Sequence, residues 1–285
     1  MLRDIRELTD QPEAYAAELD RRWGGLLSYR YIGRRFGVID DGPVEETVIL
    51  RRDMRNPAGG ILLAVLGIAS PEGGNITDLE AVPNPVIHSC QVLDAGRDVS
   101  RIEIVSEGIR RGRQMAYSRS RIVDADQRDR VLALTEGQGI SIGVPPDGLE
   151  KMAVEAIELG DSADLPPLWQ VFGGHRRDDG VWGLPELRQE LASPDAALHI
   201  GPQFVLLETA GCDIASRIAG TDVLQGVSSH VMFVARGKIG PFRVDGEPFA
   251  GADGAVAVRL RIHDEGAGDK VITTGSYVFA RGRDG

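Results

Sequence analysis

Glu208 is the residue with the clearest potential for chemistry, because it is a carboxylate that directly follows the apolar run Phe204-Val205-Leu206-Leu207. A carboxyl group buried on an apolar helix face loses its hydration, which raises its pKa toward neutrality and makes it a better general base. Such a group activates a water molecule or attacks an electrophilic carbon itself. We therefore take Glu208 as the first catalytic candidate. The alternative is that its side chain faces solvent.

The residues before this helix are candidates for an anion site. Gly201 stands at the expected helix start, where free backbone N–H groups and the helix dipole coincide. Because glycine has no Cβ, a ligand can approach this backbone closely. His199 lies nine residues before Glu208. It is either a group that orients water, substrate or the carboxylate, or a packed turn residue.

The elements that would position these groups occur first in the N-terminal half. Pro12 to Trp23 has the pattern of a capped amphipathic helix. Asn56 to Gly60 is a chain break, and Ile61 to Ala69 is apolar almost all round, which predicts a buried helix. Strands are expected at Glu45 to Asp53, Val86 to Leu93, Ser100 to Glu107, Arg113 to Val123 and Arg130 to Ile142.

The same order of elements returns in the C-terminal half. A break at Leu198 to Gly201 precedes an apolar helix pattern at Phe204 to Ala219. Strands are then expected at Val227 to Ala235, Ala255 to His263 and Lys270 to Ala280. A shift of 140 residues places Arg121-Ile122-Val123-Asp124 on Arg261-Ile262-His263-Asp264 and Val86 to Cys90 on Gly226 to His230, and a shift of 141 places Gly60 on Gly201. We interpret this as an internal repeat, with chance alignment of two β-hairpins as the alternative.

Each repeat predicts an α+β unit, in which an antiparallel sheet wraps around one central helix. Two such units cover their exposed edges by pairing edge to edge, so a fused pair is a dimer within one chain. We expect a first module at residues 1–143, a linker at 144–167 that includes a short helix from Gly148 to Leu159, and a second module at 168–285 that carries the candidate site.

The turn His199-Ile200-Gly201, with an acid nine residues after the histidine, resembles the start of the central helix in acyl-CoA thioesterases of the hotdog superfamily. The 4-hydroxybenzoyl-CoA and phenylacetyl-CoA-pathway type is the most similar. Gly226-Val227-Ser228 is similar to the family's next strand, and Gly112-Arg113-Gln114 resembles another strand start. The resemblance implies two hotdog modules and hydrolysis of an acyl thioester.

The sequence also departs from the family pattern. Ile200 and Pro202 replace parts of the glycine-rich turn in the second copy. The first copy keeps Gly59 and Gly60 but has Ala58 and Gly67 at the expected histidine and acid positions. The first module is therefore expected to lack catalytic residues.

The resemblance implies a pocket between the modules, with Glu208 as base or nucleophile and Gly201 as the oxyanion donor. Successive strand residues point to opposite faces, so at most one of His88 and Ser89 enters this pocket. We favour His88 as the third catalytic candidate beside His199, with a structural histidine as the alternative. His230 is expected to face the blank half-site, and His175 and His263 the surface. The substrate-binding candidates are Gly201, Gly59, Gly60, Ser89, Ser228 and Arg113.

Three functions fit these residues. The first is hydrolysis of an acyl-CoA or acyl-carrier-protein thioester. The second is a hotdog 3-hydroxyacyl dehydratase or hydratase, although the nine-residue spacing argues against it. The third is a noncatalytic acyl-thioester binding protein, which fits a first copy without catalytic residues.

Composition limits the partners. With 32 basic and 43 acidic residues the net charge is −11, which opposes nonspecific attraction to nucleic acid or to an anionic membrane. An anionic ligand needs a local basic patch, and Arg110, Arg111 and Arg113 are candidates unless they form only a solvated strand face.

The remaining expectations concern compartment and cofactors. Cys90 and Cys212 have no metal-ligand spacing, and no apolar run approaches the ~20 residues of a membrane span. We expect a cytoplasmic protein with no metal and no cofactor beyond the coenzyme A of its substrate. Assembly of the two-module chain into a homo-oligomer is a further expectation.

Overall fold

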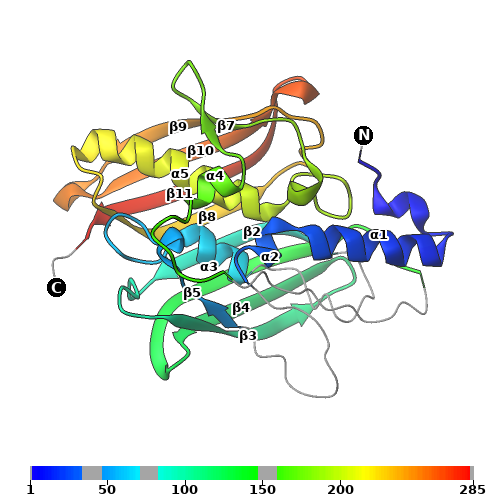
Figure 1. The fold of residues 1–285 in the computed structure, drawn as a ribbon, viewed down its shortest axis with the longest axis horizontal. Helices are drawn as coiled ribbons and strands as arrows, with labels where there is room; N and C mark the ends of the chain where they lie inside the picture. Colours follow the sequence, from blue (N-terminus) through cyan, green and yellow to red (C-terminus); the bar gives the residue numbers. More distant parts are fainter. Residues whose placement is uncertain (1, 34–46, 71–82, 147–158, 283–285) are drawn as a thin grey trace.

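The computed structural model describes residues 2–33, 47–70, 83–146 and 159–282 (Figure 1). Within these residues one antiparallel sheet runs in the order β1-β3-β4-β5-β2-β8-β11-β10-β9-β7-β6. Its first half contains β1 (Thr47–Ile49), β2 (Pro83–Val92), β3 (Arg101–Arg111), β4 (Met115–Asp124) and β5 (Gln127–Ser141). Its second half contains β6 (His175–Arg176), β7 (Trp182–Leu184), β8 (Leu224–Phe233), β9 (Phe242–Ala250), β10 (Val256–Asp264) and β11 (Lys270–Arg281).

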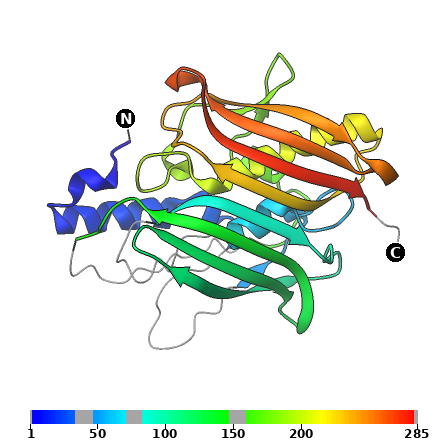
Figure 2. The same cartoon turned by 180° about the vertical axis from the view of Figure 1, so that it is seen from behind.

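The helices lie on one face of this sheet, and Figure 2 views the sheet from the opposite side. The two central helices are α3 (Leu63–Ala69) and α5 (Ile200–Ala219). The others are α1 (Pro12–Gly25), α2 (Leu27–Arg30) and α4 (Leu168–Val171). No helix among the described residues is long and apolar enough to cross a membrane.

Residue patterns account for these elements. Along β10, Val256, Val258, Leu260 and Ile262 are buried, whereas Arg259 and Arg261 point outward, as the two-residue period of a strand requires. Helix α5 is apolar on nearly all sides because it packs between the second half of the sheet and α3. It ends at Gly220, whose φ of 67° is the left-handed conformation that closes helices.

The two halves join where β2 pairs with β8, with Ser89 opposite His230. The register of β4 with β5 breaks after Ile122, and that of β10 with β11 breaks after Ile262, which are equivalent positions at a shift of 140. The registers of β2 and β8 break around residues 86 and 227, so this strand pair follows a shift of 141. The expected pair of α+β units, joined edge to edge within one chain, is confirmed.

The starts of the two central helices follow a third shift. The N-cap residues are Leu62 and His199, and isolated bridges join Arg55 to Ile61 and Ala192 to Leu198, so these segments correspond at a shift of 137. Leu62, and not Ala58, therefore occupies the His199 position of the first half. The counterpart of Glu208 falls on residue 71, which lies outside the described residues.

Gly67 has a packing role instead of marking a lost acid. A Cβ at Gly67 would lie 3.1 Å from the ring of Phe204, so glycine lets α3 approach α5 closely.

Strand β9 was not predicted from the sequence. Gly246 and Pro248 interrupt its strand pattern, and proline lacks the N–H that a strand interior uses. Within the described residues, β7 pairs with β9 only at Phe242 and Arg243. Pro248, farther along β9, therefore has a neighbouring strand on one side only, which is β10. Strand β1 is also shorter than expected, and most of the predicted linker helix falls within residues 147–158, outside the described residues.

Candidate functional site

A pocket of about 530 Å³ lies between the first turn of α3 and the middle of α5. Its walls also include the turn before α3, helix α4 and the ends of β8 and β11. The lining residues include Arg55, Asn56, Ala64, Trp169, Glu208 and Asp222. The pocket is therefore built by both halves of the chain, as the sequence predicted.

Glu208 is buried in this pocket wall, with 4% of its surface exposed. Its Oε1 accepts a hydrogen bond from the Leu63 N–H at 3.0 Å, and its Oε2 accepts one from the Ala64 N–H at 2.7 Å. These two N–H groups belong to the first turn of α3, which has no partners for them within the helix. The carboxylate from α5 therefore caps the helix of the other half, and the alternative that it faces solvent is wrong.

Burial sets the protonation of Glu208. Loss of hydration raises the pKa of its carboxyl group to about 7, while the hydrogen bonds from Ala64 and Leu63 act in the opposite direction by favouring the charged form. A pKa near neutrality suits a group that takes up and returns a proton at physiological pH.

Gly226 of β8 makes room beside the carboxylate. A Cβ there would lie 3.4 Å from Oε1 of Glu208 and 2.6 Å from Cδ1 of Leu63. A larger residue would push Leu63, and with it the start of α3, away from the carboxylate. Val205 and Cys212 lie about one turn on either side of Glu208 and line the same pocket.

His199 and Gly201 lie at the start of α5 and outside the pocket lining. The Gly201 N–H donates to Nδ1 of His199 at 3.2 Å, so the imidazole is in the neutral tautomer that carries its proton on Nε2. That Nε2–H donates to the hydroxyl of Tyr29 at 3.2 Å, and the Ser28 hydroxyl donates to Nδ1 at 2.9 Å.

Helix α2 thus covers the start of α5. A Cβ at Gly201 would lie only 2.1 Å from Oγ of Ser28, so no space remains for a ligand. This corrects the expected pairing of Glu208 with Gly201: the free N–H groups beside the carboxylate belong to Leu63 and Ala64. His199 is a packed capping residue, which was the alternative left open by the sequence.

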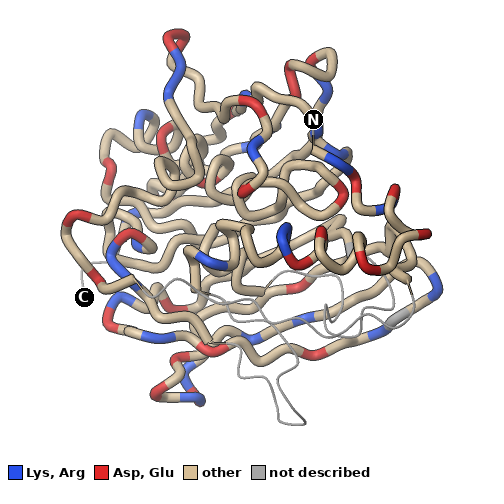
Figure 3. The backbone as a smooth tube through the Cα atoms, turned by 45° about the vertical axis from the view of Figure 1, so that its right-hand side comes forward, with Lys and Arg blue, Asp and Glu red and all other residues tan. Residues whose placement is uncertain are grey.

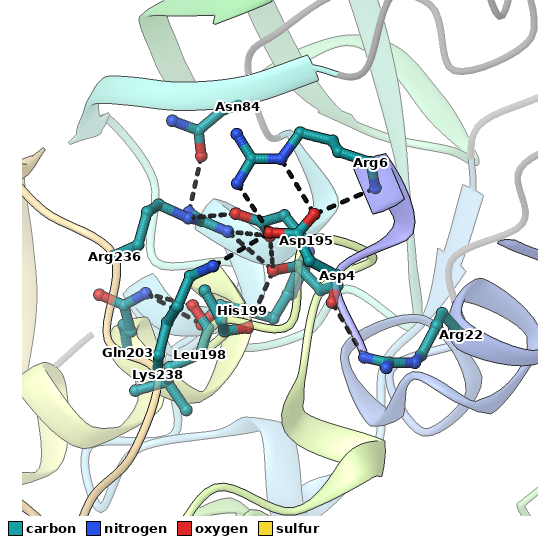
Figure 4. A network of polar contacts seen from close by, with 12 residues as sticks. Asp4, Arg6, Arg22, Asn84, Asp195, Leu198, His199, Gln203, Arg236 and Lys238 are labelled. Carbon is teal, nitrogen blue, oxygen red and sulfur yellow. Dashed lines mark hydrogen bonds and ion pairs between the residues drawn. The ribbon is translucent and has the colours of Figure 1, made fainter. Parts of the chain in front are cut away.

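A network of polar contacts holds the N-terminal segment in this position (Figure 4). Arg236 binds Asp195 through Nε at 2.7 Å and Asn84 through Nη1 at 2.6 Å. Lys238 binds Asp4 at 3.0 Å, and Arg22 donates to the Ser193 carbonyl at 3.3 Å. These contacts attach residues near the N-terminus to the loops around α5.

The two candidate residues on β2, His88 and Ser89, point to opposite faces, as expected, but neither lines the pocket. His88 is buried against the ring of Phe204, with ring centroids 5.1 Å apart, and burial lowers its pKa to about 4. Ser89 lies on the outer face, where its Oγ is 2.8 Å from Nδ1 of His230. Ser228 lies two residues before His230 on β8 and therefore points to the same outer face. His230 therefore does not face a blank half-site.

Of the other substrate-binding candidates, Gly59 and Gly60 lie in the turn next to the pocket, whereas Arg113 does not line it. Gly59 has a φ of 81° in the turn before α3, and the Gly60 N–H donates to Oδ1 of Asn56 at 3.1 Å, so both shape the turn whose Asn56 lines the pocket. Arg113 is exposed in the turn between β3 and β4.

His175 and His263 were both expected at the surface, and only one of them is exposed. His175 is exposed, as expected, but His263 is buried with Nε2 2.8 Å from Oδ2 of Asp245.

Sequence reasoning missed Leu63 and Ala64 because their contribution is a backbone N–H, which any residue type supplies. It also missed Arg55 and Trp169, which line the pocket from a turn and from the short helix α4. The one available signal was the chain break before each apolar helix, which marks both helix starts.

Solved structures with the same fold were found by comparison. The tesB protein of Mycobacterium avium subsp. paratuberculosis is 14% identical, with 85% of this chain and 94% of that chain covered and a TM-score of 0.59. A protein of unknown function with a hot dog fold from Alicyclobacillus acidocaldarius is 10% identical, with coverages of 87% and 96% and a TM-score of 0.55.

The 12:0-ACP thioesterase of Umbellularia californica is 8% identical, with 83% of this chain and 93% of that chain covered and a TM-score of 0.53. No protein-family model and no curated protein matches the sequence. At these identities the comparison establishes the fold, which consists of two hotdog modules in one chain.

Proposed function

We propose that this protein hydrolyses an acyl thioester in the pocket beside Glu208. The observation that carries the proposal is a buried carboxylate, with its pKa raised to about 7, placed at the free N–H groups of a helix start. Thioester hydrolysis needs a base or nucleophile and donors for the oxygen that becomes negative, and this arrangement supplies both. The 12:0-ACP thioesterase among the structures of the same fold supports this choice of reaction.

The carboxylate and the substrate compete for the same donors. Both oxygens of Glu208 are bound by N–H groups of α3, so a thioester carbonyl gains an oxyanion donor only by displacing one of them. We propose that the carbonyl oxygen takes the N–H of Leu63 or Ala64, and that the released carboxylate oxygen turns to a water molecule.

The reaction then follows from these positions. Glu208 takes a proton from the water as the water oxygen bonds to the carbonyl carbon, and the carbonyl oxygen becomes the anion held by the α3 N–H. The C–S bond breaks when the carbonyl re-forms, and Glu208 returns its proton to the departing sulfur. The products are a carboxylic acid and a free thiol. If Glu208 attacks directly, its oxygen bonds to the carbonyl carbon and the C–S bond breaks, so the thiolate leaves, takes a proton from water, and a mixed anhydride remains. Water then cleaves the anhydride to the carboxylic acid and free Glu208.

Release of free thiol from a panel of acyl-CoAs tests the proposal. The panel should include 4-hydroxybenzoyl-CoA and phenylacetyl-CoA, the substrates of the family type that the sequence resembles most. We expect Glu208→Gln and Glu208→Ala to lower kcat by about 10²- to 10⁴-fold, the usual size of a general-base contribution. The exposed carboxylate change Glu247→Gln is the matched control. Thiol release that survives both Glu208 changes would exclude this mechanism.

One observation favours a second function. Because both Glu208 oxygens bind backbone N–H groups, the residue also fits a purely structural cap in a noncatalytic acyl-thioester binding protein. Tight binding of acyl-CoA without thiol release would support that function. The dehydratase alternative lacks such support, since no histidine lies in the pocket lining given by the described residues. The proposed reaction uses no metal and no cofactor beyond the coenzyme A of the substrate.

A further inference from the structure

Arg55 lies in the pocket wall and is held by backbone carbonyls instead of carboxylates. Its Nη1 donates to the carbonyls of Gly59 at 3.0 Å and Gly96 at 2.9 Å, and its Nη2 donates to that of Val99. Carbonyls fix the orientation of the guanidinium without neutralising its charge, and among the described residues no carboxylate lies at ion-pair distance from it. Half-buried beside a pocket, such a charge favours an anionic ligand.

Two further arginines are exposed, Arg97 at the same turn and Arg281 beside the end of α5, next to a residue that approaches the turn. Nε of Arg97 donates to the carbonyl of Ala58 at 2.8 Å, and Ala58 follows Pro57, which lines the pocket. Nη2 of Arg97 also lies 3.0 Å from the position of a Cβ on Gly282. The neighbouring Arg281 donates through Nη2 to the Ala219 carbonyl at 3.2 Å, at the last residue of α5. Within the described parts of the chain, neither arginine has a carboxylate at ion-pair distance.

The acidic groups around these arginines are largely paired elsewhere. Asp98, whose field reaches Arg55, forms two hydrogen bonds with Arg130 at 2.9 and 2.8 Å, and Asp161 binds Arg52.

Two of the four acids in the pocket lining are paired in the same way. Asp213 has Arg176 at 3.6 Å and Arg217 at 3.4 Å, and Asp53 has Arg51 at 3.1 Å. Glu208 and Asp222 have no cation at ion-pair distance among the described residues, and Asp222 opposes an anion near the end of α5. Arg55, Arg97 and Arg281 outnumber Asp222 there, in a chain of net charge −11 whose acidic and basic residues are interspersed along the backbone (Figure 3).

We propose that Arg55, Arg97 and Arg281 form a subsite for the phosphate groups of coenzyme A, at the end of the pocket away from Glu208. This rests on the proposed function, which places the thioester carbonyl beside Glu208. Ala219 follows Glu208 by eleven residues of α5, which corresponds to about 16 Å along the helix axis. That separation fits a thioester carried on a long flexible arm whose phosphates stay at the rim.

The position of Arg55 favours coenzyme A over an acyl-carrier protein. The phosphates of free coenzyme A can approach the half-buried Arg55 from the rim, whereas the phosphate of a carrier-bound arm is joined to a folded domain that stays outside the pocket. Both sources end in a phosphorylated pantetheine arm, so the experiment has to separate them. The sequence suggested a basic patch at Arg110, Arg111 and Arg113. Arg110 and Arg113 are exposed around the turn between β3 and β4 and do not line the pocket, and the side chain of Arg111 lies outside the described part of the structure.

The charge reversals Arg97→Glu and Arg281→Glu test the subsite, because both side chains are exposed and tolerate substitution better than Arg55. The matched control is Arg110→Glu, an equally exposed arginine on β3. Calorimetry measures the Kd of coenzyme A and of 3′,5′-ADP. We expect each reversal at the rim to raise both Kd values at least tenfold, and the control to stay within twofold.

Turnover supplies the second measurement. In both reversals, kcat/KM for an acyl-CoA should fall by the same factor by which Kd rises, because KM increases. N-acetylcysteamine has no phosphate, so kcat/KM for the same acyl group on this thiol should stay constant. High salt should weaken coenzyme A binding by the wild type more than by the variants.

The outcomes separate this subsite from the proposed reaction. If no thioester is hydrolysed but the reversals still abolish coenzyme A binding, the subsite stands and the reaction falls. If hydrolysis proceeds while Arg97→Glu and Arg281→Glu leave coenzyme A binding unchanged, the subsite is overturned. If the two reversals lower the turnover of an acyl-carrier-protein substrate but not that of an acyl-CoA, coenzyme A is overturned as the carrier.

Discussion

The starts of α3 and α5 occupy equivalent places in the two halves but have opposite surroundings. At α3 the first-turn N–H groups meet the Glu208 carboxylate beside an open pocket. At α5 the Gly201 N–H meets the imidazole of His199, and Ser28 and Tyr29 of α2 fill the remaining space. Duplication of the fold therefore provides two helix starts, and the flanking segments decide which one accepts a ligand.

The short helices beside the two helix starts, α4 and α2, also differ in whether they leave space for a ligand. Helix α4 precedes the second half of the sheet and contributes Leu168 and Trp169 to the pocket wall without filling it. Helix α2 precedes the first half and places small polar groups directly on His199. A hydroxyl within hydrogen-bond distance closes a helix start, whereas a wall of apolar side chains leaves a cavity.

The largest expected effect at the two helix starts comes from the ionisation of Glu208, the α5 residue that caps α3. The pKa of Glu208 is about 7 in the folded chain and 4.5 without burial, so the unfolded chain ionises first as pH rises. The contribution of Glu208 to stability should therefore be fully present below pH 4.5, fall between pH 4.5 and 7 by about 3 kcal/mol, and be absent above pH 7.

Urea unfolding of wild type and Glu208→Gln across this range measures the effect. The difference between the two curves isolates Glu208 from the other titrating groups. Parallel curves would show that the carboxyl group is not buried as described.

A smaller effect is expected from crowding the covered start of α5. Gly201→Ala places a Cβ 2.1 Å from Oγ of Ser28, and overpacking of this kind costs about 1–3 kcal/mol. The second change Ser28→Gly should recover most of that loss, which a double-mutant cycle measures. Turnover should change little, because Gly201 lies outside the pocket. Additive losses would mean that the two residues do not touch.

The smallest effect is expected from Tyr29→Phe. This change removes the hydroxyl that accepts the Nε2–H of buried His199, at a cost of about 1 kcal/mol. The free energy of unfolding should fall by that amount while KM for an acyl thioester stays constant. A changed KM would show that the covered helix start communicates with the pocket.

The parts of the fold that were predicted from sequence depend on local patterns. The apolar stretch that ends in Glu208 and the alternation along β10 both follow from the face that each residue presents to the core. Ile122 and Ile262, which the sequence repeat aligned, also occupy equivalent positions in the structure, where the strand register breaks. Such features need no information about distant segments.

The parts that were not predicted depend on distant contacts. Ser28 and Tyr29 reach His199 across about 170 positions of sequence, and no local pattern announces that contact. The donors to Glu208 are backbone groups of the other half, so no side chain marks them. Loops of unequal length also shift the two helix starts by 137 positions and β2 and β8 by 141, which hid the true counterpart of His199.

The hydrogen-bonded seam between β2 and β8 has one more consequence. Where a comparable pocket forms between separate subunits, dilution separates them and each loses half of its walls. Here the two walls are covalently tied, so specific activity per chain should be independent of protein concentration down to the lowest amounts that can be assayed.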